Sequence, residues 1–132
     1  MSLETVTVDQ RIATTADRVW ARISTPEGIA TWWAPGNIAP VVGHEFTMDM
    51  YKWGQVRCRV IEVMPLEKLA YTFGDWELHW TITRDEGGCV LRLEHKGFDL
   101  DKEQDRIAFE NMGKGWAGTV LPRLAQGLVA AA

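Results

Sequence analysis

The hydrophobic positions of this chain follow two different periods. From Thr5 to Ile12 apolar and polar residues alternate, which predicts a β-strand. Residues 14–24 place apolar side chains three and four positions apart, which predicts a short amphipathic helix. Thr25-Pro26-Glu27 has the composition of a helix start, and a second short helix is expected to reach about Trp32 or Trp33. The chain therefore begins with one strand and two short helices.

The stretch from Gly43 to Phe98 returns to a period of two and is divided by turn signals, which predicts five more strands. One side of these strands is apolar and the other is charged, a pattern typical of an antiparallel sheet with one buried face. Ile61 and Val63 are out of phase with the rest of their strand, which indicates a β-bulge at residues 60–62.

The last part of the chain is predicted to form the longest helix. Beyond Phe98, apolar residues recur every three or four positions. Three glycines between residues 113 and 118 weaken this helix, and Pro122 cannot donate the backbone hydrogen bond to residue 118. We therefore expect a break or kink between residues 112 and 122.

This order of elements predicts an α+β fold in a single domain over residues 1–132. Its six-stranded, curved antiparallel sheet has two short helices after the first strand, and a long C-terminal helix covers its concave face. A strongly twisted sheet with one apolar face must bury that face, and one helix is too narrow to fill the concave side. We therefore expect a cavity between sheet and helix.

Composition narrows the function classes. The chain has 132 residues, of which 46% are apolar and 24% charged, as in ordinary globular proteins. Its net charge of −4 argues against a nucleic-acid partner, since such proteins display concentrated basic surface. No apolar stretch is long enough to span a membrane, and the N-terminus does not have the pattern of a signal peptide. We expect a cytosolic, cytoplasmic protein in which Cys58 and Cys89 are free thiols.

Seven tryptophans are the unusual feature of the composition. Trp76 and Trp80 lie four positions apart on one strand and so face the same side, about 13 Å apart. We assign Trp20 to core packing and Trp53 to a hairpin rim. Aromatic and methionine side chains on the predicted inner faces of the sheet and the C-terminal helix are typical of an apolar ligand pocket, although they also suit a filled core. The predicted ligand-binding residues are Trp33, Phe46, Met48, Met50, Tyr71, Trp76, Leu78, Trp80, Leu93, His95, Phe109, Met112 and Trp116.

Few polar residues are candidates for catalysis or metal binding. The three histidines lie on separate strands without metal-binding spacing, so we expect no metal and no cofactor. By alternation His79 falls on the outer face, whereas His95 falls on the buried face, where it could donate to a ligand carbonyl or act as a general base. Glu62 is a second candidate base, but the phase change around it leaves its direction open. No catalytic residue is assigned.

Several short stretches, in order along most of the chain, resemble a known family. They are Ala16-Asp17-Arg18-Val19-Trp20, Trp32-Trp33, Val60-Ile61-Glu62-Val63, Lys68-Leu69-Ala70-Tyr71-Thr72, Gly87-Gly88, Gly97-Phe98 and Gly115-Trp116. In this respect the chain resembles the helix-grip superfamily of START lipid-transfer domains, pollen-allergen-like proteins and aromatic-ring cyclases (SRPBCC). Within that superfamily it is most similar to single-domain homologues of the activator of the heat-shock protein 90 (Hsp90) ATPase. The resemblance implies the helix-grip fold and a ligand cavity, and specifies activity far less.

Three hypotheses for function follow. The first is a non-catalytic binding protein for a small hydrophobic or aromatic molecule held between the sheet and the C-terminal helix. The second is a cyclase- or hydrolase-like enzyme that uses His95 or Glu62 in the same pocket. The third is a protein-interaction or co-chaperone-like module, with a homodimer as one form of it. Under the first hypothesis we expect Trp80→Ala to reduce ligand uptake more than stability.

Overall fold

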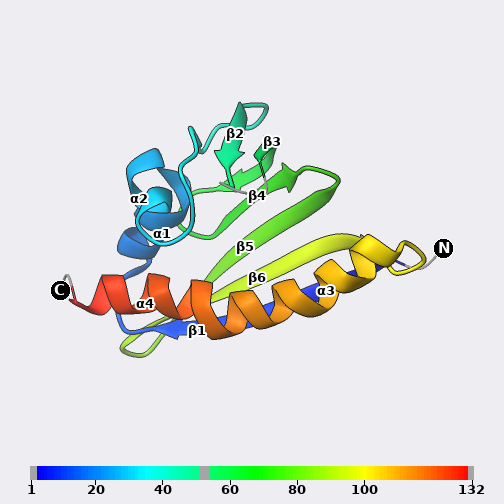
Figure 1. The fold of residues 1–132 in the computed structure, drawn as a ribbon. Coiled ribbons are helices and arrows are strands. Elements are labelled where there is room, and N and C mark those ends of the chain that lie inside the picture. Colours follow the sequence, from blue (N-terminus) through cyan, green and yellow to red (C-terminus); the bar gives the residue numbers. More distant parts are fainter. Residues whose placement is uncertain (1–2, 51–53, 131–132) are drawn as a thin grey trace.

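The computed structural model describes residues 3–50 and 54–130. Strand β1 (Leu3–Ile12) is followed by helices α1 (Ala16–Ser24) and α2 (Pro26–Ala30). The next five strands are β2 (Glu45–Asp49), β3 (Gln55–Met64), β4 (Lys68–Phe73), β5 (Trp76–Asp85) and β6 (Gly88–Asp99). The C-terminal helical rod consists of α3 (Glu103–Gly115), a π-helical segment η2 (Trp116–Val120) and α4 (Leu121–Ala130) (Figure 1).

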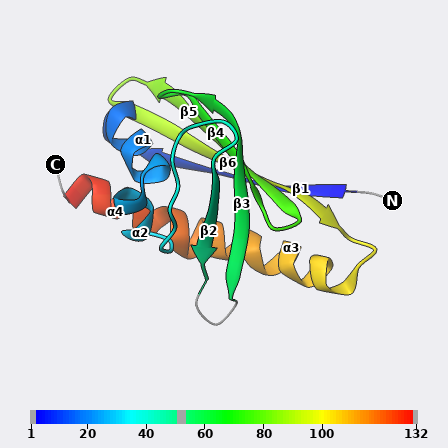
Figure 2. The same ribbon diagram turned by 90° about the horizontal axis from the view of Figure 1, so that it is seen from above.

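All six strands form one antiparallel sheet in the order β1-β6-β5-β4-β3-β2. Each strand pairs with its sequence neighbour, except that β1 closes the sheet beside the last strand, β6. The helical rod crosses one side of the sheet, while α1 and α2 lie beside its α4 end (Figures 1 and 2). The predicted α+β helix-grip architecture is confirmed.

The second helix starts as predicted and ends early. The Thr25 hydroxyl accepts a hydrogen bond from the Gly28 amide at 3.0 Å, which caps the first turn of α2. The helix ends at Ala30, before Trp32, so the prediction of a helix to Trp32 or Trp33 is wrong by two or three residues. Trp32 is nevertheless fixed in place, since its indole N–H donates to the Arg22 carbonyl at 2.8 Å.

Two bulges set which side chains face the helix. The predicted one lies in β3, where the pairing with β4 shifts between Val60 and Glu62 and leaves Ile61 exposed. The other lies in β6, where the pairing with β1 skips Gly97, whose φ of +99° is unfavourable for residues with a side chain. Because one residue is skipped, His95 and Phe98 both face inward, with ring centroids 4.5 Å apart.

The C-terminal rod changes helix type where the sequence predicts a break. Leu121 donates its backbone N–H to the carbonyl of Trp116, five residues earlier, which widens the turn. Pro122 comes next and has no N–H to donate. The π-helical turn replaces the sharp kink that the glycines and proline suggest, and it begins at Trp116, which is only 4% exposed.

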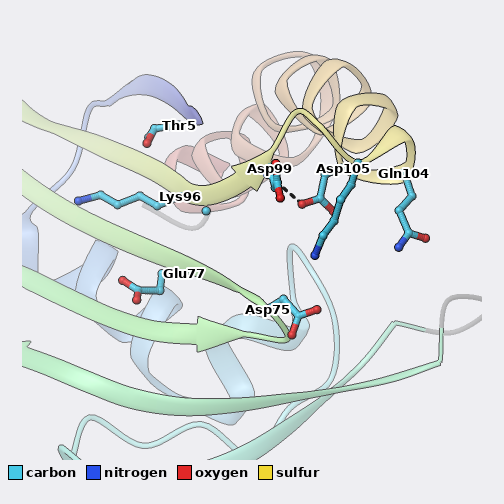
Figure 3. A pocket seen from close by; sticks show the side chains of 9 residues that line it. Thr5, Asp75, Glu77, Lys96, Asp99, Gln104 and Asp105 are labelled. Atoms are coloured by element: carbon cyan, nitrogen blue, oxygen red, sulfur yellow. Dashed lines mark hydrogen bonds between the residues drawn. The ribbon is translucent and has the colours of Figure 1, made fainter. Parts of the chain in front are cut away.

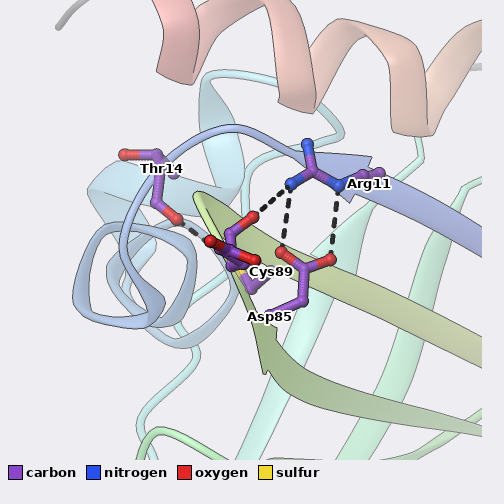
Figure 4. A network of polar contacts seen from close by, with 5 residues as sticks. Arg11, Thr14, Asp85 and Cys89 are labelled. Carbon is purple, nitrogen blue, oxygen red and sulfur yellow. Dashed lines mark hydrogen bonds and ion pairs between the residues drawn. The ribbon is translucent and has the colours of Figure 1, made fainter.

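The two faces of the sheet differ in polarity as predicted. The inner face carries the apolar core, whereas the outer face and the strand ends carry ion pairs such as Arg92–Asp9 and Arg11–Asp85. In Figure 4 the Arg11 guanidinium also donates to the Glu86 carbonyl, which ties β1 to the β5–β6 turn. His79 lies on the outer face but is buried, with Nε2 2.8 Å from the Glu77 carboxylate, so its expected solvent exposure is wrong.

Candidate functional site

An aromatic cluster occupies the concave side of the sheet. At its centre the fully buried ring of Trp80 contacts Trp32 and Trp116, with centroid separations of 5.6 and 5.7 Å. The Trp80 indole N–H donates to the Tyr71 hydroxyl at 3.0 Å. Burial raises the pKa of the Tyr71 hydroxyl far above its usual range, so this group stays neutral. The centre of the cluster is therefore packed and its polar groups are paired, so side chains fill the space where the sequence predicted a cavity.

His95 connects this centre to the end of the sheet where β5 begins and β6 ends. Its Nδ1 lies 3.1 Å from the indole nitrogen of Trp116. An indole N–H can only donate, so Nδ1 must accept and carries no proton. Burial lowers the pKa of His95 to about 3, which keeps the imidazole neutral at pH 7. The single ring proton therefore sits on Nε2.

The Nε2–H donor of His95 has no acceptor among the described residues. The histidine is completely buried between four rings, those of Phe73, Trp76, Phe98 and Trp116. A buried donor without a partner costs about 1 to 3 kcal/mol. Such groups are uncommon in folded proteins and require an explanation.

Trp76 carries a second unpaired donor beside the first. Its indole Nε1–H is buried without a partner, although the residue as a whole is half-buried. The ring centroids of Trp76 and His95 are 5.1 Å apart. Gly97 lies opposite Trp76, and a Cβ there would make only ordinary contact with the indole ring, at 3.7 Å. The two unpaired N–H groups thus belong to neighbouring rings.

The predicted ligand-binding residues divide into two groups by burial. Eight are buried in the core, and they are Phe46, Met48, Tyr71, Leu78, Trp80, Leu93, His95 and Trp116. Five are half-buried and pack against that core; we call them the rim, and they are Trp33, Met50, Trp76, Phe109 and Met112. Trp20 is also half-buried against the core, and Trp53 lies outside the described residues.

The rim residues come from element ends and from α3. Met50 directly follows β2, Trp76 opens β5, and Phe109 and Met112 lie on α3, which follows β6. Phe109 contacts Phe98 with ring centroids 5.5 Å apart, so α3 covers the β6 end of the concave face. Trp33 contacts Phe73 and Trp116, which links the rim to the buried centre.

Two surface hollows of about 600 and 620 Å³ lie outside this cluster, and neither is lined by a predicted ligand-binding residue. The first is lined mostly by residues with polar or charged side chains, among them Lys96, Asp99 and Asp105 (Figure 3). The Asp105 carboxylate accepts from the Asp99 amide at 2.9 Å, and the Asp99 carboxylate accepts from the Asp101 amide at 3.1 Å. These carboxylates cap the turn before α3, the role expected for a charged helix start.

The two candidate bases do not have the geometry of a base. Glu62 pairs across the sheet with Ala70 and faces outward, where its carboxylate lies 3.2 Å from the Lys68 ammonium. The bulge at Ile61 reverses the direction that simple alternation would give. The Nδ1 lone pair of His95 is already used by Trp116, and its Nε2 carries a proton.

The cysteines are free and buried, as predicted. Burial raises the pKa of the Cys58 thiol to about 12 and raises that of Cys89, so neither is a reactive thiolate at neutral pH. Within residues 3–50 and 54–130 no three His, Cys, Asp or Glu side chains gather as a metal site would require. No helix in this part of the chain is both long and apolar enough to cross a membrane.

A curved antiparallel sheet that grips a C-terminal helix defines the helix-grip class of proteins. Residues 13–128 match the family model described as activator of Hsp90 ATPase homolog 1-like protein, and the chain belongs to this family. A comparison with curated proteins gave no match.

Solved structures agree with this assignment. Protein MLL2253 from Mesorhizobium loti is 27% identical with a TM-score of 0.86, and the match covers 97% of this chain and 98% of that one. Protein BH1534 from Bacillus halodurans is 25% identical with a TM-score of 0.81, covering 96% and 98%. The Aha1 dimer from Colwellia psychrerythraea is 14% identical with a TM-score of 0.77, covering 95% and 96%. The last similarity concerns the fold alone.

Sequence reasoning missed the hydrogen bond between Trp116 and His95, the inward position of Phe98 and the two unpaired donors. Gly97 was the one available signal, since an isolated glycine within a strand often marks a bulge. The pairing of His95 with Trp116 joins residues 21 positions apart and depends on the docking of the rod against the sheet.

Proposed function

We propose that this protein is a single-domain, cytosolic binding protein for a small apolar or aromatic molecule, which it holds at the rim between the sheet and α3. The observation that carries this proposal is the incomplete burial of Trp33, Met50, Trp76, Phe109 and Met112. These three aromatic and two methionine side chains pack against the core and keep part of their surface exposed. The fully buried ring cluster behind them forms the floor of the site.

The rim has the composition that apolar binding requires. Burying apolar surface contributes about 25 cal/mol per Å², so even a ligand of one ring gains several kcal/mol from contacts with these side chains. Methionine side chains adapt their shape to different ligands, and aromatic rings offer large, rigid contact areas. Ligand sites are typically apolar with a few polar groups that fix orientation, as here.

The enzymatic alternative receives no support from the two bases suggested for it. Glu62 points away from the concave face and forms an ion pair with Lys68. His95 is held neutral with its only free nitrogen protonated, so it can donate but not accept a proton at pH 7.

A titration with α-methylstyrene, a one-ring hydrocarbon, tests the proposal. We expect saturable binding to the full chain, measured by quenching of tryptophan fluorescence. Met112→Glu places a charge at the rim and should weaken binding at least tenfold, because the charge must be desolvated or the ligand displaced.

The control is Ile107→Glu, on the same helix, where the side chain is 51% exposed. It adds the same charge outside the rim and should leave the affinity unchanged. Equal weakening by both variants, or no saturable binding to the unchanged protein, would contradict the proposal. Native mass spectrometry of protein purified without organic solvent adds a direct view of any co-purified molecule and of the subunit count.

An interaction module is the second candidate, and one feature favours it. Val41, Val42, Ile61 and Met64 are large apolar residues with 40–62% exposure. The Gly43 amide donates to the Val60 carbonyl at 2.8 Å, which places the loop with both valines beside exposed Ile61 on β3.

For this candidate we propose a homodimer, the state named for the Colwellia protein. The alternative within it is a co-chaperone-like module that binds a different protein. Sedimentation across a hundredfold concentration range tests self-association, and Ile61→Asp should shift any dimer towards monomer. A monomer at all concentrations would contradict the homodimer hypothesis.

A further inference from the structure

His95 and Trp76 present two N–H donors that the fold buries and does not satisfy. They come from neighbouring strands, β5 and β6, and their ring centroids are 5.1 Å apart. Both rings also contact Phe98, at 4.5 Å from His95 and 4.8 Å from Trp76. The surroundings are therefore aromatic, and none of these three rings offers a strong acceptor at this position.

The donor character of both groups is fixed. An indole nitrogen is always a donor, and the His95 Nε2 is one because Trp116 donates to Nδ1. A single carbonyl oxygen has two lone pairs and can accept from two donors. A ligand oxygen placed within hydrogen-bond distance of both nitrogens would satisfy both N–H groups at once.

We propose that His95 and Trp76 together recognise an oxygen acceptor, so that the ligand is an apolar compound carrying a ketone, ester or similar carbonyl group. This inference rests on the proposed function, since it names the class of molecule that the rim binds. Trp76 belongs to both sites. Its ring is part of the apolar rim and also packs against the ring of His95.

A matched pair of probes isolates the contribution of the carbonyl oxygen to binding. Acetophenone and α-methylstyrene have the same shape, with C=O in one replaced by C=CH₂ in the other. We define the selectivity as the Kd of α-methylstyrene divided by the Kd of acetophenone, measured on the full chain. Trp76→Phe removes one N–H and keeps an aromatic ring, so selectivity should fall about three- to tenfold, the usual contribution of one hydrogen bond. Any change in the Kd of α-methylstyrene itself reports the smaller ring at the rim, and the ratio of the two Kd values removes this contribution.

Trp33→Phe is the control variant. Trp33 is also a rim indole, but its N–H is not one of the buried donors without a partner. Selectivity should be unchanged in this variant. An equal loss in Trp33→Phe and Trp76→Phe would overturn the role of the donor pair.

NMR of the ¹⁵N-labelled protein reads His95 directly, without a variant that would also deprive Trp116 of its acceptor. The His95 Nε2–H and Trp76 Nε1–H proton resonances should move downfield with acetophenone and not with α-methylstyrene. Unchanged resonances and an unchanged selectivity, with both probes bound, would mean that solvent satisfies these donors and would overturn this inference alone. Failure of α-methylstyrene to bind would overturn the proposed function and this inference with it.

Discussion

Two tryptophans on one strand show how the concave face differs from place to place. Trp80 and Trp76 lie four residues apart on β5 and face the same side of the sheet. Trp80 is fully buried and its N–H is paired with Tyr71, whereas Trp76 is half-buried and its N–H is unpaired. The same residue type is therefore fully packed and paired at one position, and only partly packed with an unpaired N–H at the other.

The difference follows from what covers each position. Trp80 lies against Trp32, from the segment after α2, and against Trp116, from the rod. Trp76 lies against His95 and Phe98 of the sheet itself. The indole N–H of Trp80 is paired where sheet, α2 segment and rod meet, whereas the indole N–H of Trp76 has no partner among the described residues.

The largest expected effect is the dependence of stability on pH through His95. Its folded pKa of about 3 lies below the unfolded value of 6.5, so the unfolded chain binds the extra proton between these pH values. Stability is therefore fully present above pH 6.5 and is lost as pH falls towards 3, by on the order of 5 kcal/mol. Urea unfolding across this range measures it. His95→Phe should show a flatter curve, and identical curves would contradict neutral burial of His95.

The next effect sharpens the assignment of Trp80 to packing. Trp80→Ala removes a fully buried ring and should cost about 3 to 5 kcal/mol of unfolding free energy. Burial revises the expectation from sequence, in which loss of ligand uptake was the main effect. A loss below about 1 kcal/mol in urea unfolding would show that the centre is loosely filled.

A smaller change tests the paired N–H. Trp80→Phe keeps an aromatic ring and leaves the Tyr71 hydroxyl without its donor, which should cost about 1 to 3 kcal/mol. The same urea measurement applies, and the double variant with Tyr71→Phe should recover part of the loss. Additive losses in the double variant would show that the hydrogen bond contributes nothing.

The smallest effect is expected at the other indole. Trp76→Phe removes a buried N–H that has no partner, and this gain should offset the loss of indole contact, so the unfolding free energy should change by less than about 0.5 kcal/mol. A loss as large as that of Trp80→Phe would erase the distinction between the two positions.

The order of elements and the inner face of the sheet could be predicted because they depend on local periodicity. The direction of Glu62 could not, since a single skipped residue in β3 reverses it. The inward position of Phe98 depends on a second bulge at Gly97. In the sequence, the glycine itself is the one sign of this bulge. The docking of the rod decides which aromatic residues are buried. The spacing of residues within one strand gives no information on this docking.

The rim is proposed to bind a small apolar molecule. Methionines labelled with ¹³C at the methyl group report on it directly, because Met50 and Met112 belong to the rim and Met64 is exposed on β3. In an NMR titration with α-methylstyrene, the Met50 and Met112 methyl resonances should shift saturably with a common Kd, while Met64 stays unchanged. Shifts at Met64 alone, or equal and non-saturating shifts at all three, would contradict the account.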